Sequence, residues 1–197
     1  MNRDTPPIIF WLLMVNTIIF LLPQALPSVR FPLGALALYS NVENFRLWQI
    51  ITYAFLHGDF SHLLFNMFAL WMFGRDIEQT WGSARFATYY FACVITAAIT
   101  QLIWTGFPSG FASTVGASGG VFGILMAYGM CFPNRRIMLL VPPIPMKAKY
   151  FVVIFAILEL YLGFANTNSG TAHFAHLGGL VGGLILIQYW RRKRLIR

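Results

Sequence analysis

The chain has 197 residues, of which 58% are apolar and only 10% are charged, and its mean hydropathy is +0.66. Soluble globular domains carry about 25% charged residues, so this composition excludes an ordinary soluble domain and indicates that lipid surrounds most of the chain. The formal net charge of +8 is compatible with nucleic-acid binding. The basic residues, however, lie between the apolar segments and in the tail at 191–194, as in cytoplasmic loops of membrane proteins, so we expect no nucleic-acid partner.

The N-terminal part predicts one membrane span and one interfacial helix. Residues 8–22 form the first apolar segment. A cleaved signal peptide is the competing interpretation, but one Asp offsets the single Arg before this segment and no clear small-residue cleavage site follows it, so we expect a retained helix. Residues 45–56, in the long first loop, are apolar and aromatic but too short to span, which predicts a helix lying in one leaflet.

Five more apolar segments follow. The second, at 61–73, is short for a hydrocarbon core that needs about 20 residues, and the others lie at 86–104, 115–132, 150–165 and 171–190. We interpret the stretches between them as loops, at 74–85, 105–114, 133–149 and 166–170. The sequence therefore predicts an all-α membrane protein, a single domain over 1–197 built as a six-helix transmembrane bundle. Cys93 and Cys131 lie within or at the end of apolar segments, which predicts buried, unpaired thiols.

The distribution of positive charge predicts the orientation. In a six-span chain the termini, the second-to-third loop and the fourth-to-fifth loop share one side of the membrane. All but two of the 14 basic residues lie on that side, namely Arg3, Arg75, Arg85, Arg135, Arg136, Lys147, Lys149, Arg191, Arg192, Lys193, Arg194 and Arg197. The exceptions are Arg30 and Arg46. The positive-inside rule places both termini in the cytoplasm, so we expect an integral protein of the plasma (inner) membrane.

Ser118 lies among glycines, in the sequence Val-Gly-Ala-Ser-Gly-Gly at 115–120, where the fourth span begins. Small residues on a membrane helix usually mark close helix packing, and this stretch alone favours that interpretation. The alternative is that Ser118 is a nucleophile. The first N–H groups of a helix have no intrahelical partner, so they can hold a negative oxygen that forms beside the serine.

The predicted orientation places four polar side chains at similar depth in the outer leaflet. His62 and Asn66 lie in the first turns of the second span, Ser118 begins the fourth, and His176 lies near the start of the sixth. Polar groups at such depth are costly and usually line a cavity. We therefore expect a water-filled cavity that opens to the extracytoplasmic side.

Helical spacing predicts which faces meet. His176 shares its face with Gly179 and Gly183, which permit another backbone to approach closely. Ser118 shares its face with Phe122, Leu125 and Gly129, whereas a separate stripe holds Gly116, Gly120, Gly123 and Ala127. We expect a central fourth helix, packed on both sides, that contacts the sixth helix along the Ser118 face and so brings the hydroxyl to the His176 ring.

These residues resemble the rhomboid family of intramembrane serine proteases over residues 48–183. The resemblance is carried by Gly116-Ala117-Ser118-Gly119, by Ala175-His176 with Gly179, and by His62 with Asn66. It implies that Ser118 is the nucleophile and His176 the general base. It also implies that the oxyanion hole is surrounded by His62, Asn66 and Gly116, and that Glu78 in the second-to-third loop is structural.

Two positions depart from the family pattern. The first loop has Trp48-Gln49 where the family often has Trp-Arg, which leaves the anchoring role of that Arg open. Phe122 stands where a Tyr often stacks on the catalytic His, so the ring is kept and the hydroxyl is lost. We assign Phe122, Gly179 and Gly183 to support of the site.

The resulting hypothesis is an endopeptidase that cleaves single-span membrane proteins near the outer end of their helix, without metal or cofactor. No acidic residue is near His176 in the sequence, so we expect a dyad rather than a triad. We expect Glu159 to be structural, His173 to form a hydrogen bond at the cavity mouth and His57 to be a loop or packing residue. By resemblance, residues 166–170 and the fifth span are candidates for a moving gate.

Two alternatives stay open. A metal or haem protein could use the four histidines, although it leaves Asn66 and the glycines around Ser118 unused. An inactive relative could bind membrane helices without cutting them. A zinc intramembrane protease is disfavoured, because the sequence has no His-Glu-x-x-His.

Overall fold

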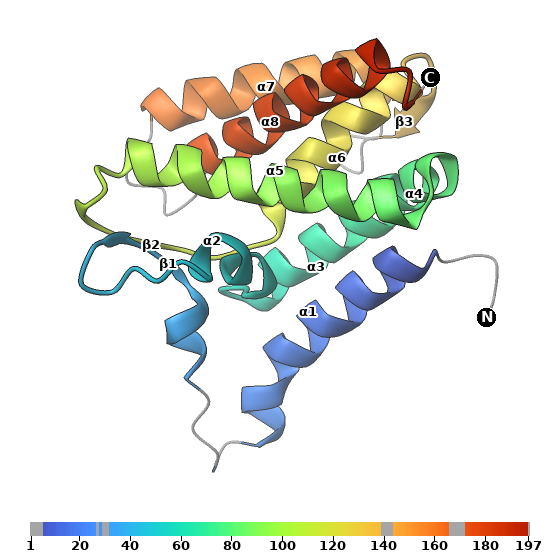
Figure 1. Cartoon of the computed structure of the whole chain (residues 1–197). Coiled ribbons are helices and arrows are strands. Elements are labelled where there is room, and N and C mark those ends of the chain that lie inside the picture. Colours follow the sequence, from blue (N-terminus) through green and yellow to red (C-terminus); the bar gives the residue numbers. More distant parts are fainter. Residues whose placement is uncertain (1–5, 27, 29–31, 139–143, 166–171, 197) are drawn as a thin grey trace.

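The computed structural model describes residues 6–26, 28, 32–138, 144–165 and 172–196. These residues form a helical bundle with two small two-stranded sheets (Figure 1). The described part of the chain has three helices that are long and apolar enough to cross a membrane, α1 (Pro7–Ala25), α5 (Ser83–Trp104) and α7 (Ala148–Ala165). The chain is therefore an all-α membrane protein. The remaining long helices are α6 (Ser118–Cys131), which is apolar but shorter, and α8 (His173–Arg192).

The second helix is longer than predicted. α3 (Phe60–Ala69) continues through a π-helical turn, η3 (Leu70–Gly74), into α4 (Arg75–Trp81). The predicted polar loop at 74–85 is therefore wrong over most of its length. The chain turns only at Gly82, where φ is +81°, a conformation that favours glycine.

Glu78 explains why polar residues occur in this helix. Its side chain is 2% exposed and accepts hydrogen bonds from the backbone N–H groups of Ile8 and Ile9, at 3.0 and 2.9 Å, and from the Ser83 hydroxyl at 2.6 Å. Both N–H groups belong to the first turn of α1, where they have no intrahelical partner. The carboxylate thus caps α1 from a neighbouring helix, the structural role that the resemblance implies, although Glu78 is in a helix and not in a loop.

The first loop is anchored by Gln49, at the start of α2 (Gln49–Thr52). This side chain is 1% exposed. Its amide nitrogen donates to the carbonyl oxygens of Ala35 and Asn44, and its amide oxygen accepts from the backbone N–H groups of Arg46 and Tyr39. An uncharged side chain therefore ties the loop together at the position where the resembled family often has Arg. The predicted helix at 45–56 consists of α2 and the short 3-10 helix η2 (Tyr53–Phe55), and another 3-10 helix, η1 (Leu33–Leu36), precedes it.

Two strand pairs were not predicted from the sequence. β1 (Leu38–Asn41) pairs antiparallel with β2 (Ser109–Thr114), within the stretch that was expected to be a loop at 105–114. β3 (Arg136–Met138) pairs with β4 (Pro145–Lys147) in the fourth-to-fifth loop. The first pair fastens the first loop to the segment that leads into α6, and so positions the entrance to Ser118.

α6 is enclosed by the other helices. Ten of its 14 residues are buried, and it contacts α5, α7 and α8. Gly120 and Gly123 lie against Tyr90 and Cys93 of α5, as the predicted stripe of small residues requires. Cys93 is buried and Cys131 partly buried, and both are unpaired.

α6 and α8 come close together at Gly119 and Gly179. A Cβ atom on Gly179 would overlap the carbonyl oxygen of Gly119. Two details of the predicted faces are wrong, because Gly129 lies against Val152 of α7 and Gly183 against Tyr89 of α5. Periodicity gave the residues that share a face, but not which neighbour each face meets.

The ends of the bundle differ in charge. α4, β3 and the last turn of α8 lie at the end where α1 begins, whereas β1, β2 and α2 lie at the other end (Figure 1). The basic clusters therefore gather at one end, and Arg46 lies near the other. Arg3, Arg30, Arg197 and the proposed gate segment at 166–170 lie outside the described residues.

Candidate active site

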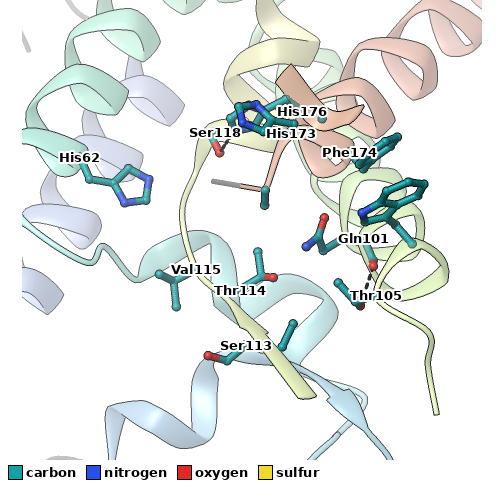
Figure 2. A pocket seen from close by; sticks show the side chains of 14 residues that line it. His62, Gln101, Thr105, Ser113, Thr114, Val115, Ser118, His173, Phe174 and His176 are labelled. Carbon is teal, nitrogen blue, oxygen red and sulfur yellow. Dashed lines mark hydrogen bonds between the residues drawn. The ribbon is translucent and has the colours of Figure 1, made fainter. Parts of the chain in front are cut away.

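Ser118 and His176 meet where α6 and α8 begin. The Oγ atom of Ser118 lies 2.7 Å from the Nε2 atom of His176 (Figure 2). The Phe122 ring stacks on the imidazole, with a centroid distance of 4.3 Å and an angle of 9° between the planes. The side of Gly179 that lacks a side chain lies against the backbone of Gly119, and this close approach brings the two helices near enough for the contact.

Glu159 of α7 lies on the other side of the imidazole. Its Oε2 atom is 2.9 Å from Nδ1 of His176 and 2.7 Å from Nδ1 of His173. All three residues are buried. A dyad was expected because no acidic residue is near His176 in the sequence, but in the structure a carboxylate contacts the ring. Glu159 is 17 residues away in sequence, but the packing of α7 against α8 brings it into contact.

His62 reaches the site from the first turn of α3. Asp59 caps this helix, and its carboxylate accepts the backbone N–H of His62 at 2.8 Å. The backbone N–H of Gly58 donates to Nδ1 of His62, at 3.5 Å. In the neutral ring this places the proton on Nε2. The Nε2 atom lies beside Gly116, and a Cβ atom added to Gly116 would be only 2.7 Å from it. Gly116 has a φ of +128°, so both space and backbone conformation require glycine.

The other two residues predicted to surround an oxyanion hole have different partners. The backbone N–H of Gly116 donates to the Tyr53 carbonyl at 2.9 Å, so this donor is already used. The amide nitrogen of Asn66 donates to the His62 carbonyl of its own helix, also at 2.9 Å. Gly116 thus acts by leaving room for His62, and Asn66 lies behind the histidine. The first hydrogen bond of α6 runs from the Val121 N–H to the Ala117 carbonyl. The backbone N–H of Ser118 comes before it in the helix, and so has no acceptor within α6.

A cavity of about 410 Å³ opens beside Ser118. Figure 2 shows side chains around it from α3, α5, α8 and the segment leading into α6, among them His62, Gln101, Thr105, Thr114, His173 and Phe174. The contribution of α5 and β2 was not predicted from the sequence. The uncharged, Gly- and Ser-containing stretch just before Ser118 was the available indication, but its pairing with β1 could not be inferred from it.

Two ionisable residues that precede α3 have shifted pKa values. Burial, together with the neighbouring His62 ring at 5.0 Å, lowers the pKa of His57 to about 4. The Ser61 hydroxyl and the backbone N–H of His62 donate to Asp59 and hold the pKa of its carboxyl below the usual range. Near pH 7 His57 is therefore neutral and Asp59 ionised, the state that suits a helix N-terminus.

The four histidines do not form one metal centre. His57 packs edge-on against His62, whereas His173 and His176 form a second pair with ring centroids 6.3 Å apart. Among the described residues, the side chains close enough to share a metal ion are Glu159, His173 and His176, whose ligand atoms lie within 4.8 Å of one another. A centre built from all four histidines is thus contradicted.

Comparison with known proteins identifies the family. A family model of the rhomboid domain matches residues 44–193, most of the chain. The chain belongs to the rhomboid family. The matched region contains the elements that surround Ser118 and His176, and α1 lies entirely outside it.

Several curated proteins are similar to this rhomboid. Rhomboid protease GluP of Bacillus subtilis is 34% identical over 137 residues, which cover 69% of this chain and 24% of that protein. Rhomboid protein 1, mitochondrial, of Saccharomyces cerevisiae is 30% identical over 181 residues, 90% of this chain and 51% of that protein. Rhomboid protease GlpG of Photorhabdus laumondii is 22% identical over 186 residues, 94% of this chain and 62% of that protein. The chain thus spans about a quarter to three fifths of the length of these relatives.

Proposed function

We propose that this rhomboid is an intramembrane serine endopeptidase with Ser118 as nucleophile and His176 as general base. The observation that carries the proposal is the 2.7 Å distance between Ser118 Oγ and His176 Nε2 beside a cavity. A serine hydroxyl is a weak nucleophile and needs an adjacent base. The protease names of two relatives agree with this chemistry.

The geometry supports an acyl-enzyme mechanism. As Ser118 Oγ bonds to the scissile carbonyl carbon, its proton passes to His176 Nε2. The C–N bond then breaks, and His176 gives the proton to the leaving amine. Water attacks the resulting ester and returns a proton to His176, and the C–O bond to Ser118 breaks with reprotonation of the hydroxyl.

Two donors are available for the negative oxygen of the tetrahedral intermediate. We assign this role to the backbone N–H of Ser118, at the start of α6, and to the Nε2–H group of His62 across the cavity. Gly116 and Asn66 support His62 from behind, by the open space and the hydrogen bond described above. Phe122, Gly179 and Gly183 hold the two helices and the imidazole in place.

The position of the site suits a membrane-helix substrate. A peptide bond within a helix is shielded, so a single-span protein has to unwind locally to reach Ser118, and helix-weak residues such as Gly near the cut favour this. We infer six spans, formed by α1, α3 with α4, α5, α6, α7 and α8. The basic clusters at one end favour cytoplasmic termini in the plasma (inner) membrane and a site near the extracytoplasmic surface.

The test is cleavage of a panel of single-span proteins by the purified protein in lipid vesicles, with labelling by a fluorophosphonate probe. We expect cleavage and labelling with the wild type, and neither with Ser118→Ala. Ser109→Ala, an exposed serine on β2, is the matched control and should keep both. Full activity of Ser118→Ala would contradict the proposal. A wild type that binds the panel but neither cleaves nor labels would point to an inactive helix-binding relative.

A further inference from the structure

We propose that Glu159 is a positioning residue for His176, so that the site works as a Ser118–His176–Glu159 triad in which His173 holds the carboxylate. This inference rests on the proposed function of Ser118 and His176. It replaces the dyad expected from the sequence, and it assigns a role to a carboxylate inside a membrane-spanning helix, where an unpaired charge is costly.

The distances connect the three groups in order. The hydroxyl of Ser118 is 2.7 Å from Nε2 of His176, and Nδ1 of the same ring is 2.9 Å from Oε2 of Glu159. A carboxylate only accepts hydrogen bonds, so Nδ1 carries the proton and Nε2 has a free lone pair. This is the tautomer that can take the proton of Ser118. When the imidazolium forms, the carboxylate stabilises it without taking the proton.

The stacking of Phe122 does not achieve this selection. When an imidazole ring flips by 180° about its Cβ–Cγ bond, its plane stays the same. The flip, however, puts carbon atoms at the positions that the two nitrogen atoms held. The plane is fixed by Phe122, at 9° to the imidazole. The hydrogen bond to Glu159 selects both the ring orientation and the protonated nitrogen. The two contacts therefore act on different degrees of freedom of His176.

His173 keeps the carboxylate ionised and in place. Its Nδ1 lies 2.7 Å from the same Oε2 atom, so two N–H groups converge on one oxygen of Glu159. Accepting two hydrogen bonds favours the charged form of a carboxylate. His173 lies three residues before His176 on α8, close to one helical turn, so one helix supplies both donors and α7 supplies the acceptor.

The first test compares Glu159→Gln with Glu78→Gln. Both variants replace a buried carboxylate by an amide of the same size. Glu78, however, binds backbone N–H groups of α1, and it neither lines the cavity nor contacts Ser118 or His176. An amide that donates to Nδ1 imposes the wrong tautomer. We expect kcat of Glu159→Gln to fall by about 10²–10⁴-fold with little change in KM, and fluorophosphonate labelling of Ser118 to slow in parallel. Glu78→Gln should keep the wild-type kcat per folded molecule.

The second readout is the protonation pattern of the ring, from NMR of protein with ¹⁵N-labelled histidine. We expect the proton of neutral His176 on Nδ1 in the wild type and on Nε2 in Glu159→Gln. His173→Gln leaves the bond between Glu159 and His176 intact, so its kcat should fall by less than about tenfold and the tautomer should not change. A purely structural Glu159 would lower the amount of folded protein and leave the tautomer as it is.

The outcomes separate this inference from the proposed function. If the wild type cleaves and Glu159→Gln has a kcat within about threefold of it, the triad is overturned and the dyad stands. If Ser118→Ala is active, the proposed function fails as well. Should Glu159→Gln not fold, Glu159→Asp keeps the charge but shortens the side chain. We then expect at least about a tenfold loss of kcat, and wild-type kcat in that variant would overturn the triad.

Discussion

His62 is held from three directions at the level of single residues. Gly58 donates to its Nδ1, Asp59 accepts its backbone N–H, and the Asn66 side chain donates to its carbonyl oxygen. None of these three partners is among the residues that line the cavity. They fix the position of the imidazole, and an oxyanion donor is effective only when its position is fixed before the reaction.

Asn66→Ala tests this support. Loss of one oxyanion donor typically costs about 10²–10³ in turnover, and we expect a loss of kcat in that range because His62 becomes mobile. Asn16→Ala is the matched control, since the Asn16 amide is also buried and also donates to the carbonyl four residues earlier, on Leu12. Its kcat should not change. An equal loss in both variants, measured per folded molecule, would show that the effect is not specific to His62.

The crossing of α6 and α8 determines the site at the level of elements. Gly119 and Gly179 contact each other through the backbone, and the reacting side chains lie within one turn of this point. A displacement of about 1 Å between reacting groups can cost about 10²-fold in rate. The two glycines are therefore part of the geometry of the proposed site.

Gly179→Ala is expected to separate these helices. The added methyl group would overlap the Gly119 carbonyl, and overpacking of this kind costs about 1–3 kcal/mol. We expect a lower unfolding temperature in detergent and a loss of kcat of about 10²-fold. Gly34→Ala is the control, because among the described residues its Cβ would meet only the Tyr39 hydroxyl, at 3.8 Å. Unchanged cleavage by Gly179→Ala would mean that the crossing tolerates a wider separation than the structure has.

At the level of the whole molecule, the distribution of charge predicts the orientation in the membrane. The end of the bundle that holds α4, β3 and the last turn of α8 is basic, and the cavity beside Ser118 lies toward the opposite end. The positive-inside rule predicts that the basic end is cytoplasmic. A membrane-impermeant thiol reagent applied to intact cells reports which end faces outward.

Val42→Cys and Met138→Cys form a matched pair for this measurement. The two side chains are 64% and 58% exposed, and they lie next to β1 and on β3, at opposite ends of the bundle. We expect Val42→Cys to react in intact cells and Met138→Cys to react only after permeabilisation. The reverse pattern would place the site on the cytoplasmic side. The natural Cys93 and Cys131 give the background in the unmodified protein.

Local sequence determined the outline of this protein. Apolar segments gave the positions of the helices, because lipid requires continuous apolar surface and internally satisfied backbone groups. Charge between the segments gave the proposed orientation. Helical periodicity, with glycines on the facing sides, predicted that Ser118 would meet His176, and their distance is 2.7 Å.

Tertiary structure alone decided the surroundings of that pair. Glu159 reaches His176 because α7 packs on α8 with the face that carries Glu159 turned toward it. Periodicity gives the residues that share a face, but it does not give which face a helix turns toward its neighbour. The same limit hid the pairing of β1 with β2 and the use of the Gly116 N–H by Tyr53. The polar residues at 75–81 indicated a loop, but they are helical. Among them, the Glu78 carboxylate accepts hydrogen bonds from backbone N–H groups of α1, which lie about 70 residues away in the sequence.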